Sequence, residues 1–312
     1  MSIQDDMREK ITNKIVAALE SGTSPWRKPW VGGGMPINLV SKKAYRGINT
    51  ILLSLHQMAH NLSSNVYATY KQWKDVGCQV KARPKDLEGE FGAGIIFFAP
   101  VKGTKMQANG EEKTFSFPIM RSYTVFNADQ VEGASEYLAK RVKAEPKTPA
   151  ELHEDAERVI AAYLAAESLK VKPSNHAAYS PSEDVVMMPD REAFTMGTNS
   201  YYGTMMHELV HSTGHENRLN RLTKFSRFGS QAYALEELVA EIGGCYMLGS
   251  VGLPVLDALE NHANYLANWL SVLKADSKAI FQASAAAAAA ADRILKPSGI
   301  LEDAEVEEPA LS

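Results

Sequence analysis

Two histidines four residues apart, His207 and His211, enclose Glu208 in the stretch TMMHELVHSTGHENR. On a helix this spacing places both imidazoles on one face, about one turn apart, where they can bind the same metal ion. In such a site Glu208 does not bind the metal, but takes a proton from metal-bound water and delivers it to the leaving group. The pattern therefore predicts a metal-dependent hydrolase, and the alternative is two histidines that hydrogen-bond within a core.

A catalytic zinc site also needs a third protein ligand and an open position for water. The stretch LEELVAEIGG supplies three candidates on the next expected helix, Glu236, Glu237 and Glu241. Glu237 and Glu241 share a face, so one can bind metal while the other accepts a hydrogen bond from a ligand histidine. Glu236 is offset by about 100° and is expected to face solvent or cap a neighbour. Zinc is the default ion for such ligands, and Mn²⁺ or Co²⁺ can replace it.

His215 lies four residues past His211 and would be a further ligand if the helix continued. The intervening S-T-G favours a helix end, with Gly214 as the C-terminal cap. We therefore expect His215 to leave the shared face and to act locally or behind the metal ligands. Position 217, where a metzincin would carry another histidine, holds Asn217.

The front of the chain combines aromatic and basic side chains at short spacing. Single-stranded nucleic acids are bound by aromatics that stack on bases and by cations that follow the phosphates. Residues 1–131 carry 17 basic and 11 acidic residues, a net charge of +6, whereas residues 132–312 carry 16 and 26, a net charge of −10. We therefore expect nucleic-acid binding here, although solvated lysines and buried aromatics would give the same pattern. The candidates are Trp26, Arg27, Lys28, Trp30, Lys42, Lys43, Tyr45, Arg46, Lys71, Trp73 and Lys74.

The composition is that of an ordinary globular protein, with 45% hydrophobic and 22% charged residues among 312. This length favours two domains over one. The chain has no apolar run of roughly 18 residues, the length of a membrane span, and residues 1–22 lack a secretory apolar region. A cytoplasmic location without membrane association is therefore expected. Cys78 and Cys245 are too few for a disulfide framework and too far apart for a CxxC metal site.

The pattern around these residues mixes helices and strands, which predicts an α+β fold. Strands are expected at 94–101 and 117–127, joined by a turn at Asn109-Gly110, and a second hairpin is expected between 177 and 188. Residues 132–150 contain two prolines and weak periodicity, typical of a linker, and the acidic tail 299–312 is expected to be disordered. Helices are predicted at about 3–20, 48–61, 151–169, 199–213, 231–249 and 255–295.

The order of the motifs along the chain is specific as well. The stretches PWRKPW, PINLVSKKAYRGIN, ATYKQWKDVGCQVK, HELVHSTGHENRL and LEELVAEIG resemble the ArdC family of plasmid-encoded antirestriction proteins, and a similar N-terminal module occurs in certain conjugative-plasmid primases. The resemblance covers nearly all of residues 5–295. It implies an α+β single-stranded-DNA-binding domain at 1–131, a linker at 132–150 and a zincin-like α+β metallopeptidase domain at 151–298. It also implies a function in conjugation, the protection of incoming DNA from host restriction.

The resemblance assigns the metal ligands to His207, His211 and Glu237 and the catalytic acid and base to Glu208, with Glu241 behind them. Two functions follow as alternatives. The first is a zinc peptidase tethered to DNA, with a peptide or protein substrate such as a host restriction component. The second is a non-catalytic protein that protects DNA by coating it, with a structural or vestigial metal site. A metal-dependent nuclease is a third alternative, which the helix-borne H-E-x-x-H disfavours.

Overall fold

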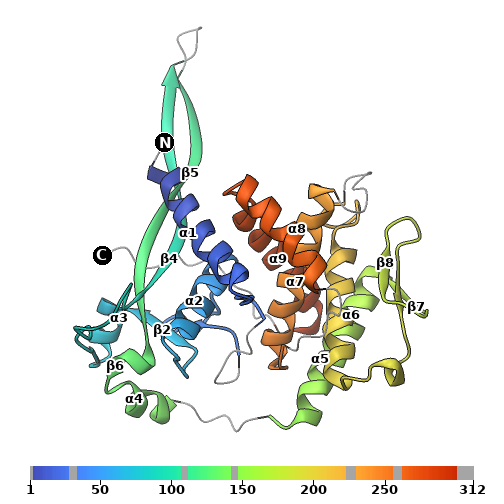
Figure 1. The fold of residues 1–312 in the computed structure, drawn as a ribbon, viewed down its shortest axis with the longest axis horizontal. Helices are drawn as coiled ribbons and strands as arrows, with labels where there is room; N and C mark the ends of the chain where they lie inside the picture. Colours follow the sequence, from blue (N-terminus) through green and yellow to red (C-terminus); the bar gives the residue numbers. More distant parts are fainter. Residues whose placement is uncertain are drawn as a thin grey trace.

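The N-terminal part of the chain is built on a four-stranded sheet (Figure 1). The computed structural model describes residues 3–27, 34–106, 112–141, 147–222, 230–255 and 262–300. The strands of this part are β1 (Ile37–Asn38), β2 (Val66–Thr69), β3 (Gln79–Val80), β4 (Ala93–Met106), β5 (Glu112–Asn127) and β6 (Val131–Glu132). Its helices are α1 (Ile3–Glu20), α2 (Ile48–Ala59), α3 (Tyr70–Asp75) and α4 (Ala134–Arg141). The sheet order is β1-β2-β5-β4, and β3 pairs separately with β6.

Strands β4 and β5 form a long two-stranded ribbon that projects away from the helices (Figure 1). They pair antiparallel from Ala93 opposite Val125 to Met106 opposite Glu112. Both strands predicted from the sequence are confirmed, and both are longer than the apolar stretches that predicted them. Backbone pairing continues through polar residues beyond the point where apolar side chains end. The predicted turn at Asn109-Gly110 lies outside the described residues.

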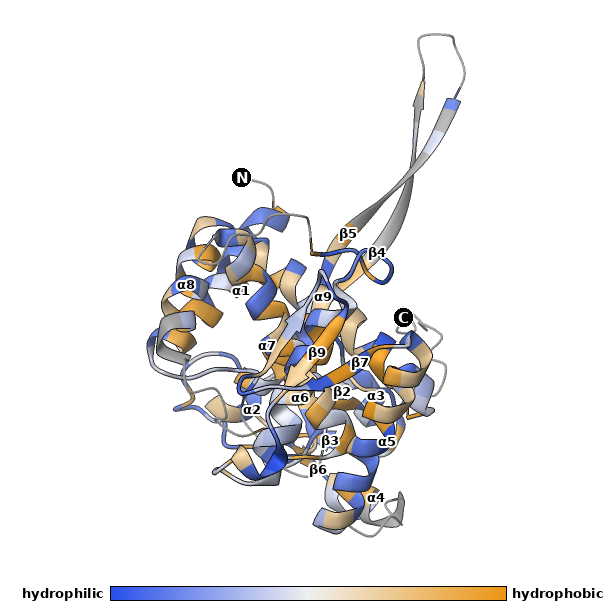
Figure 2. Cartoon of the chain, turned by 90° about the vertical axis from the view of Figure 1, so that its right-hand side faces the viewer, coloured by the Kyte–Doolittle hydropathy of each residue, from blue (hydrophilic) through white to orange (hydrophobic). Residues whose placement is uncertain are grey.

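The C-terminal part places helices against a small sheet. Its elements are α5 (Pro149–Glu167), β7 (Lys170–Pro173), β8 (Ala178–Ser180), β9 (Val185–Met188), α6 (Thr198–Thr213), α7 (Gln231–Val251), α8 (His262–Ala275) and α9 (Ala279–Leu295). The predicted hairpin is present, since β8 and β9 pair antiparallel, and β7 adds to the other side of β9 in parallel. The sheet order β7-β9-β8 puts the apolar β9 in the centre (Figure 2) and leaves β8 at an edge.

Two details differ from the expected elements. Helix α4 lies within residues 132–150, where a linker is predicted, and residues 142–146 of that range are not described. The single helical region expected from 255 to 295 is divided into α8 and α9 in its described part. The division falls at Asp276, whose carboxylate accepts a hydrogen bond from the Lys278 backbone N–H at 2.8 Å. A side chain that bonds the backbone in this way competes with helix continuation.

Helix α7 packs closely between α6 and α9 because the contact positions carry small residues. A Cβ at Gly243 would lie 2.9 Å from Cγ2 of Val210 on α6 and 3.5 Å from the carbonyl oxygen of Ala287 on α9. The alanine tract of α9 contributes buried Ala287, Ala290 and Ala291 to this core. The tract therefore has a packing function, and the close approach of α6 and α7 brings the predicted metal ligands together.

The main hydrophobic core contains residues from both parts of the chain. Ile15 and Leu19 of α1 are buried in the same cluster as the C-terminal helices. Thr12 of α1 donates a hydrogen bond to the carbonyl oxygen of Ser277 at 2.9 Å. Helix α1 is therefore anchored on the C-terminal part of the chain. The domain boundaries expected from the sequence, with a first domain at 1–131 and a second at 151–298, remain predictions. Among the described helices, none combines the length and the apolar character that crossing a bilayer requires.

Candidate metal centre

Helix α6 presents His207 and His211 side by side. Their ring centroids are 4.8 Å apart, and their Nε2 atoms are separated by 3.2 Å. A four-residue spacing brings two side chains to the same face only in a helix, and α6 is helical past both histidines, up to Thr213. Both side chains are almost fully buried, with 11% and 13% of their surface exposed. Two polar rings in such a place need partners.

Helix α7 supplies the partner through Glu237. Its Oε2 lies 3.6 Å from Nε2 of His207, and its Oε1 lies 3.5 Å from Nε2 of His211. In a tetrahedral site, ligand atoms bound at about 2.0–2.1 Å lie roughly 3.3 Å from one another. The three side chains therefore fit a divalent cation, and within the described residues they form the group with metal-ligand geometry.

The charges of Glu237 and His211 stabilise one another. Burial disfavours the ionised Glu237, but hydrogen bonds with His207 and His211 outweigh it and hold the pKa of the carboxyl below its ordinary value. Burial likewise disfavours the protonated His211, but Glu236 and Glu237 raise the pKa of this imidazole to about 10. A metal ion that binds Nε2 of His211 must therefore displace a proton.

Substitution of a ligand should remove metal binding more than folding. We expect His211→Ala to lower the affinity for Zn²⁺ by more than about 100-fold, because losing a hydrogen-bonding partner behind a ligand already costs about 10- to 100-fold. Competition of wild type and variant against a chromophoric chelator measures this, with His176→Ala as the control. His176 is an exposed histidine of the loop before β8. Equal affinities in His211→Ala and wild type would contradict the predicted ligand set.

Glu208, the predicted acid and base, lies on α6 beside the first ligand histidine. It follows His207 on α6, its side chain is buried, and its charge acts on His211 and on Tyr265 of α8. Its carboxylate is not one of the three converging ligand atoms. A carboxylate beside the ligands, rather than among them, is placed to exchange protons with a metal-bound water.

The two neighbouring glutamates exchange the places expected for them. Glu236, expected to face solvent or cap a neighbour, has only 12% of its side chain exposed, and its Oε1 lies 3.4 Å from Nδ1 of His211. Glu241, expected behind the ligands, instead forms a buried ion pair with Arg27 of the N-terminal part. Apart from Glu237, the acid that contacts a ligand histidine is therefore Glu236. Its 100° offset from Glu237 directs it to the C-terminal end of α6, a placement that depends on how the helices cross.

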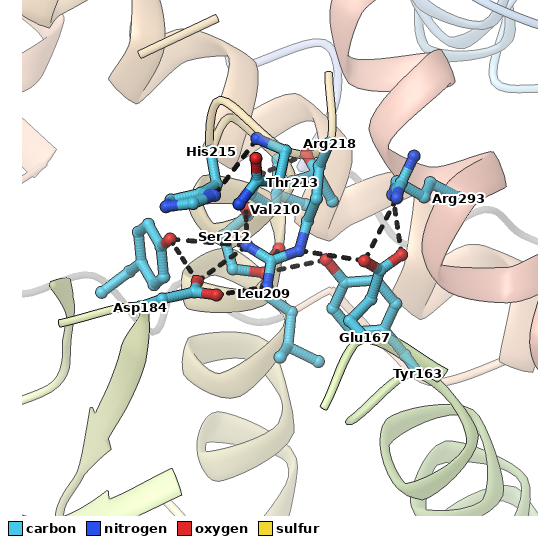
Figure 3. Close-up of polar contacts among 12 residues, drawn as sticks. Tyr163, Glu167, Asp184, Leu209, Val210, Ser212, Thr213, His215, Arg218 and Arg293 are labelled. Atoms are coloured by element: carbon cyan, nitrogen blue, oxygen red, sulfur yellow. Dashed lines mark hydrogen bonds and ion pairs between the residues drawn. The ribbon is translucent and has the colours of Figure 1, made fainter. Parts of the chain in front are cut away.

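His215 lies beyond the end of α6 and apart from the three ligand atoms. Helix α6 stops at Thr213 with Gly214 as its C-cap, as predicted. Gly214 has an ordinary helical conformation, and glycine is needed for space, since a Cβ there would lie 2.8 Å from Cγ of Leu222. His215 accepts a hydrogen bond from the backbone of Asn217 and sits beside a polar cluster around Arg218 (Figure 3).

The Arg218 cluster holds the β8–β9 hairpin against the end of α6 (Figure 3). Arg218 is almost fully buried and donates to both carboxylate oxygens of Asp184 at 2.8 Å, to Glu167 at 3.1 Å and to the carbonyl of Ser212 at 3.0 Å. Arg293 of α9 binds the same Glu167. Sequence reasoning did not identify this cluster, because its members are distributed over residues 167 to 293.

The tyrosine pair that precedes the H-E-x-x-H makes other contacts, since the ring of Tyr201 packs against Phe194 and against Tyr202. The buried Tyr202 donates its hydroxyl to Glu157 at 2.7 Å, a structural role. Tyr233, one turn before Glu237 on α7, is nearer to the ligands. Burial together with hydrogen bonds to Tyr265 and Glu237 raises the pKa of the Tyr233 hydroxyl.

The aromatic residues predicted to stack on bases are largely buried. Trp26 packs against Trp269 of α8, with ring centroids 5.9 Å apart, and Trp73 donates its indole N–H to the Phe126 carbonyl. Tyr45 is half-buried and accepts a hydrogen bond from Asn38. Of the predicted cations, Arg27 pairs with Glu241 and Arg46 pairs with Asp292. Lys28 and Trp30 lie outside the described residues.

Four predicted lysines remain exposed, and they lie on neighbouring elements. Lys42 and Lys43 are on the turn after β1, and Lys71 and Lys74 are on α3. The two elements are joined, since Asn38 donates a hydrogen bond to Gln72 of α3 at 3.3 Å. Tyr70, next to Lys71, is 47% exposed. We call these five residues, Lys42, Lys43, Tyr70, Lys71 and Lys74, the α3 basic surface.

Both parts of the chain match known protein families. Residues 5–126 match the family described as the N-terminal domain of anti-restriction factor ArdC, and residues 154–286 match zincin-like metallopeptidase. Uncharacterized protein y4eC of Sinorhizobium fredii is 34% identical over 92% of this chain and 91% of its own length. A DNA primase TraC of Escherichia coli is 31% identical over 95% of this chain, which spans only 20% of that primase.

Solved structures give the same picture over almost the whole chain. The metal-free crystal structure of the antirestriction ArdC protein from plasmid R388 superposes with a TM-score of 0.74, at 35% identity, over 95% of this chain and 99% of that one. The Mn(II)-bound structure of that protein gives a TM-score of 0.71 at 33% identity, over 96% of this chain and 98% of that one.

Proposed function

This chain belongs to the ArdC family of antirestriction proteins, and we propose that it binds single-stranded DNA through its N-terminal part and hydrolyses a peptide bond at the centre between α6 and α7. In this proposal it acts in the cytoplasm during plasmid conjugation and protects incoming DNA from host restriction. The protein substrate would be a component of the restriction machinery.

The observation that carries the enzymatic part is the convergence of three ligand atoms with Glu208 buried beside them. His207, His211 and Glu237 would hold Zn²⁺, and the Mn(II)-bound ArdC structure supports a divalent ion of this kind. When bound, the ion would polarise the substrate carbonyl and make a water molecule more acidic. Glu208 would accept a proton from the attacking water and pass it to the leaving amine.

The position of the edge strand β8 supports the proposal that the substrate is a peptide. Its outer side is unpaired among the described strands, and it packs against α6, which carries the histidines. An extended peptide can add to such an edge through backbone hydrogen bonds. The Arg218 cluster would keep this strand at a fixed distance from the metal ligands.

The α3 basic surface supports the DNA part of the proposal. Its four lysines provide charge for phosphates, and the exposed ring of Tyr70 provides a face for one base. This surface differs from the one predicted from the sequence, since Trp26, Arg27 and Trp73 are engaged inside the protein. Binding that rests on lysines is expected to depend strongly on salt.

A salt titration tests this surface. Full-length protein should bind fluorescently labelled oligothymidylate, with an affinity that falls as salt rises. Lys71→Ser/Lys74→Ser should reduce the slope of log affinity against log salt by about 1.4, since each contacted phosphate of a single strand contributes about 0.7. Lys170→Ser/Lys296→Ser is the matched control, because both lysines are exposed on the C-terminal part. An equal change in both double variants, or no binding at low salt, would contradict the proposal.

The second candidate is a non-catalytic protein that protects DNA by coating it. One observation favours this candidate: the three ligands join the two closely packed core helices α6 and α7, as in a structural metal site. In this case the metal stabilises the fold, and Glu208 has no part in protection. The two candidates therefore differ in what substitution of Glu208 does.

A further inference from the structure

We propose that Arg221 and Glu236 form a positioning pair that orients His211 for metal binding, an inference that rests on the metal centre of the proposed function. Neither side chain supplies one of the three converging ligand atoms. Arg221 fixes the carboxylate of Glu236, and Glu236 fixes the imidazole of His211.

The chain after α6 folds back onto the end of that helix and delivers Arg221. The backbone N–H groups of Arg221 and Leu222 both donate to the carbonyl of Gly214 at 2.9 Å. The guanidinium then donates from Nη1 to Oγ1 of Thr213 at 2.8 Å and from Nη2 to the carbonyl of Val210 at 2.9 Å. A cation at a helix C-terminus satisfies free carbonyls and complements the helix dipole. Arg221 is therefore held on α6 independently of α7.

The same guanidinium binds Glu236 on α7 through both carboxylate oxygens. Nε lies 3.1 Å from Oε2, and Nη2 lies 2.9 Å from Oε1. The two side chains are 14% and 12% exposed, so water competes little for this fork. A bidentate arginine fixes the plane of a carboxylate, which a lysine cannot do.

Glu236 passes this orientation to His211. Its Oε1 lies 3.4 Å from Nδ1 of His211, on the opposite side of the ring from the Nε2 that meets Glu237. An imidazole that donates Nδ1–H to a carboxylate presents the lone pair of Nε2 to a metal. His207 is held differently, since its buried Nδ1 has no hydrogen-bond partner among the described residues. The pair therefore acts on one of the two histidines.

Zinc affinity tests the pair. Glu236→Ala should weaken Zn²⁺ binding by about 10- to 100-fold, the usual loss when an outer carboxylate is removed. Glu236→Gln keeps an acceptor oxygen and should recover part of this loss. Arg221→Lys should weaken binding although its charge is unchanged. In ¹⁵N-edited spectra of the zinc-loaded protein, the Nδ1–H signal of His211 should move in Arg221→Lys.

Arg218→Lys is the matched control. Arg218 belongs to the same loop, is buried and binds carboxylates, but among the described contacts its partners Asp184 and Glu167 do not bind a ligand histidine as Glu236 does (Figure 3). It should lower the unfolding temperature and leave zinc affinity unchanged. Wild-type affinity in Glu236→Ala, or equal losses in Arg221→Lys and Arg218→Lys, would overturn the positioning pair alone. A wild-type protein that binds no divalent ion would overturn the metal centre as well.

Discussion

Replacing Glu208 with glutamine is expected to leave the fold and Zn²⁺ affinity intact and to lower peptide hydrolysis by about 10²–10⁴-fold, the usual contribution of a general base. The reason is the division of roles at the centre. The three ligand atoms belong to His207, His211 and Glu237, so the metal does not need Glu208. Proton transfer does, because a glutamine amide cannot accept the proton of the attacking water. Release of fluorescent peptides from labelled casein by the zinc-loaded protein measures the effect.

The control and the cellular experiment separate the two candidate functions. Glu216→Gln alters an exposed acid just past the end of α6 and should change nothing. Glu208→Gln should also abolish protection of conjugated DNA in a restricting host. If protection survives while hydrolysis is lost, the peptidase does not cause antirestriction and the coating function stands. If the wild type cleaves no casein, the labelled components of a host restriction complex are the next substrates to assay.

The metal ligands illustrate what sequence can predict. His207 and His211 are fixed relative to one another by one helix, so their spacing alone indicates a shared face. Glu237 needs the additional fact that α7 lies on α6, and the glycines of α7 at the contact, Gly243 and Gly244, permit this. Glu236 shows the limit. Whether an acid offset by 100° meets solvent or His211 depends on the crossing of two helices, which local periodicity does not contain.

The aromatic residues of the N-terminal part show a second limit. In PWRKPW, Trp26 beside two basic residues has the pattern of a nucleic-acid contact, but a tryptophan buried in the core beside two basic residues has the same sequence pattern. The residue that decides between them is Trp269, more than 240 positions away in the sequence. The exposure of Lys71 and Lys74 is easier to predict, because lysine side chains are rarely fully buried. Charge at the surface is a local property, and burial of an aromatic is not.

The buried ion pair of Arg27 with Glu241 leads to the second prediction with a large expected effect, a loss of stability. The ion pair is inside the protein, with 8% and 5% of the two side chains exposed, and it joins the N-terminal part to α7 one turn after Glu237. Arg27→Met should lower the free energy of unfolding by about 3–5 kcal/mol, because it leaves the Glu241 carboxylate buried without its partner. Urea denaturation followed by circular dichroism measures the loss.

The double variant Arg27→Met/Glu241→Met separates the charge from the packing. It replaces both ions with apolar groups of similar size, so most of the stability should return. Zn²⁺ affinity should follow the same order, since α7 carries Glu237. The alternative is the sequence-based role of Arg27 as a DNA contact. If Arg27 contacts DNA, Arg27→Met should weaken oligothymidylate binding and change the free energy of unfolding only slightly. This result would mean that the ion pair opens when DNA binds.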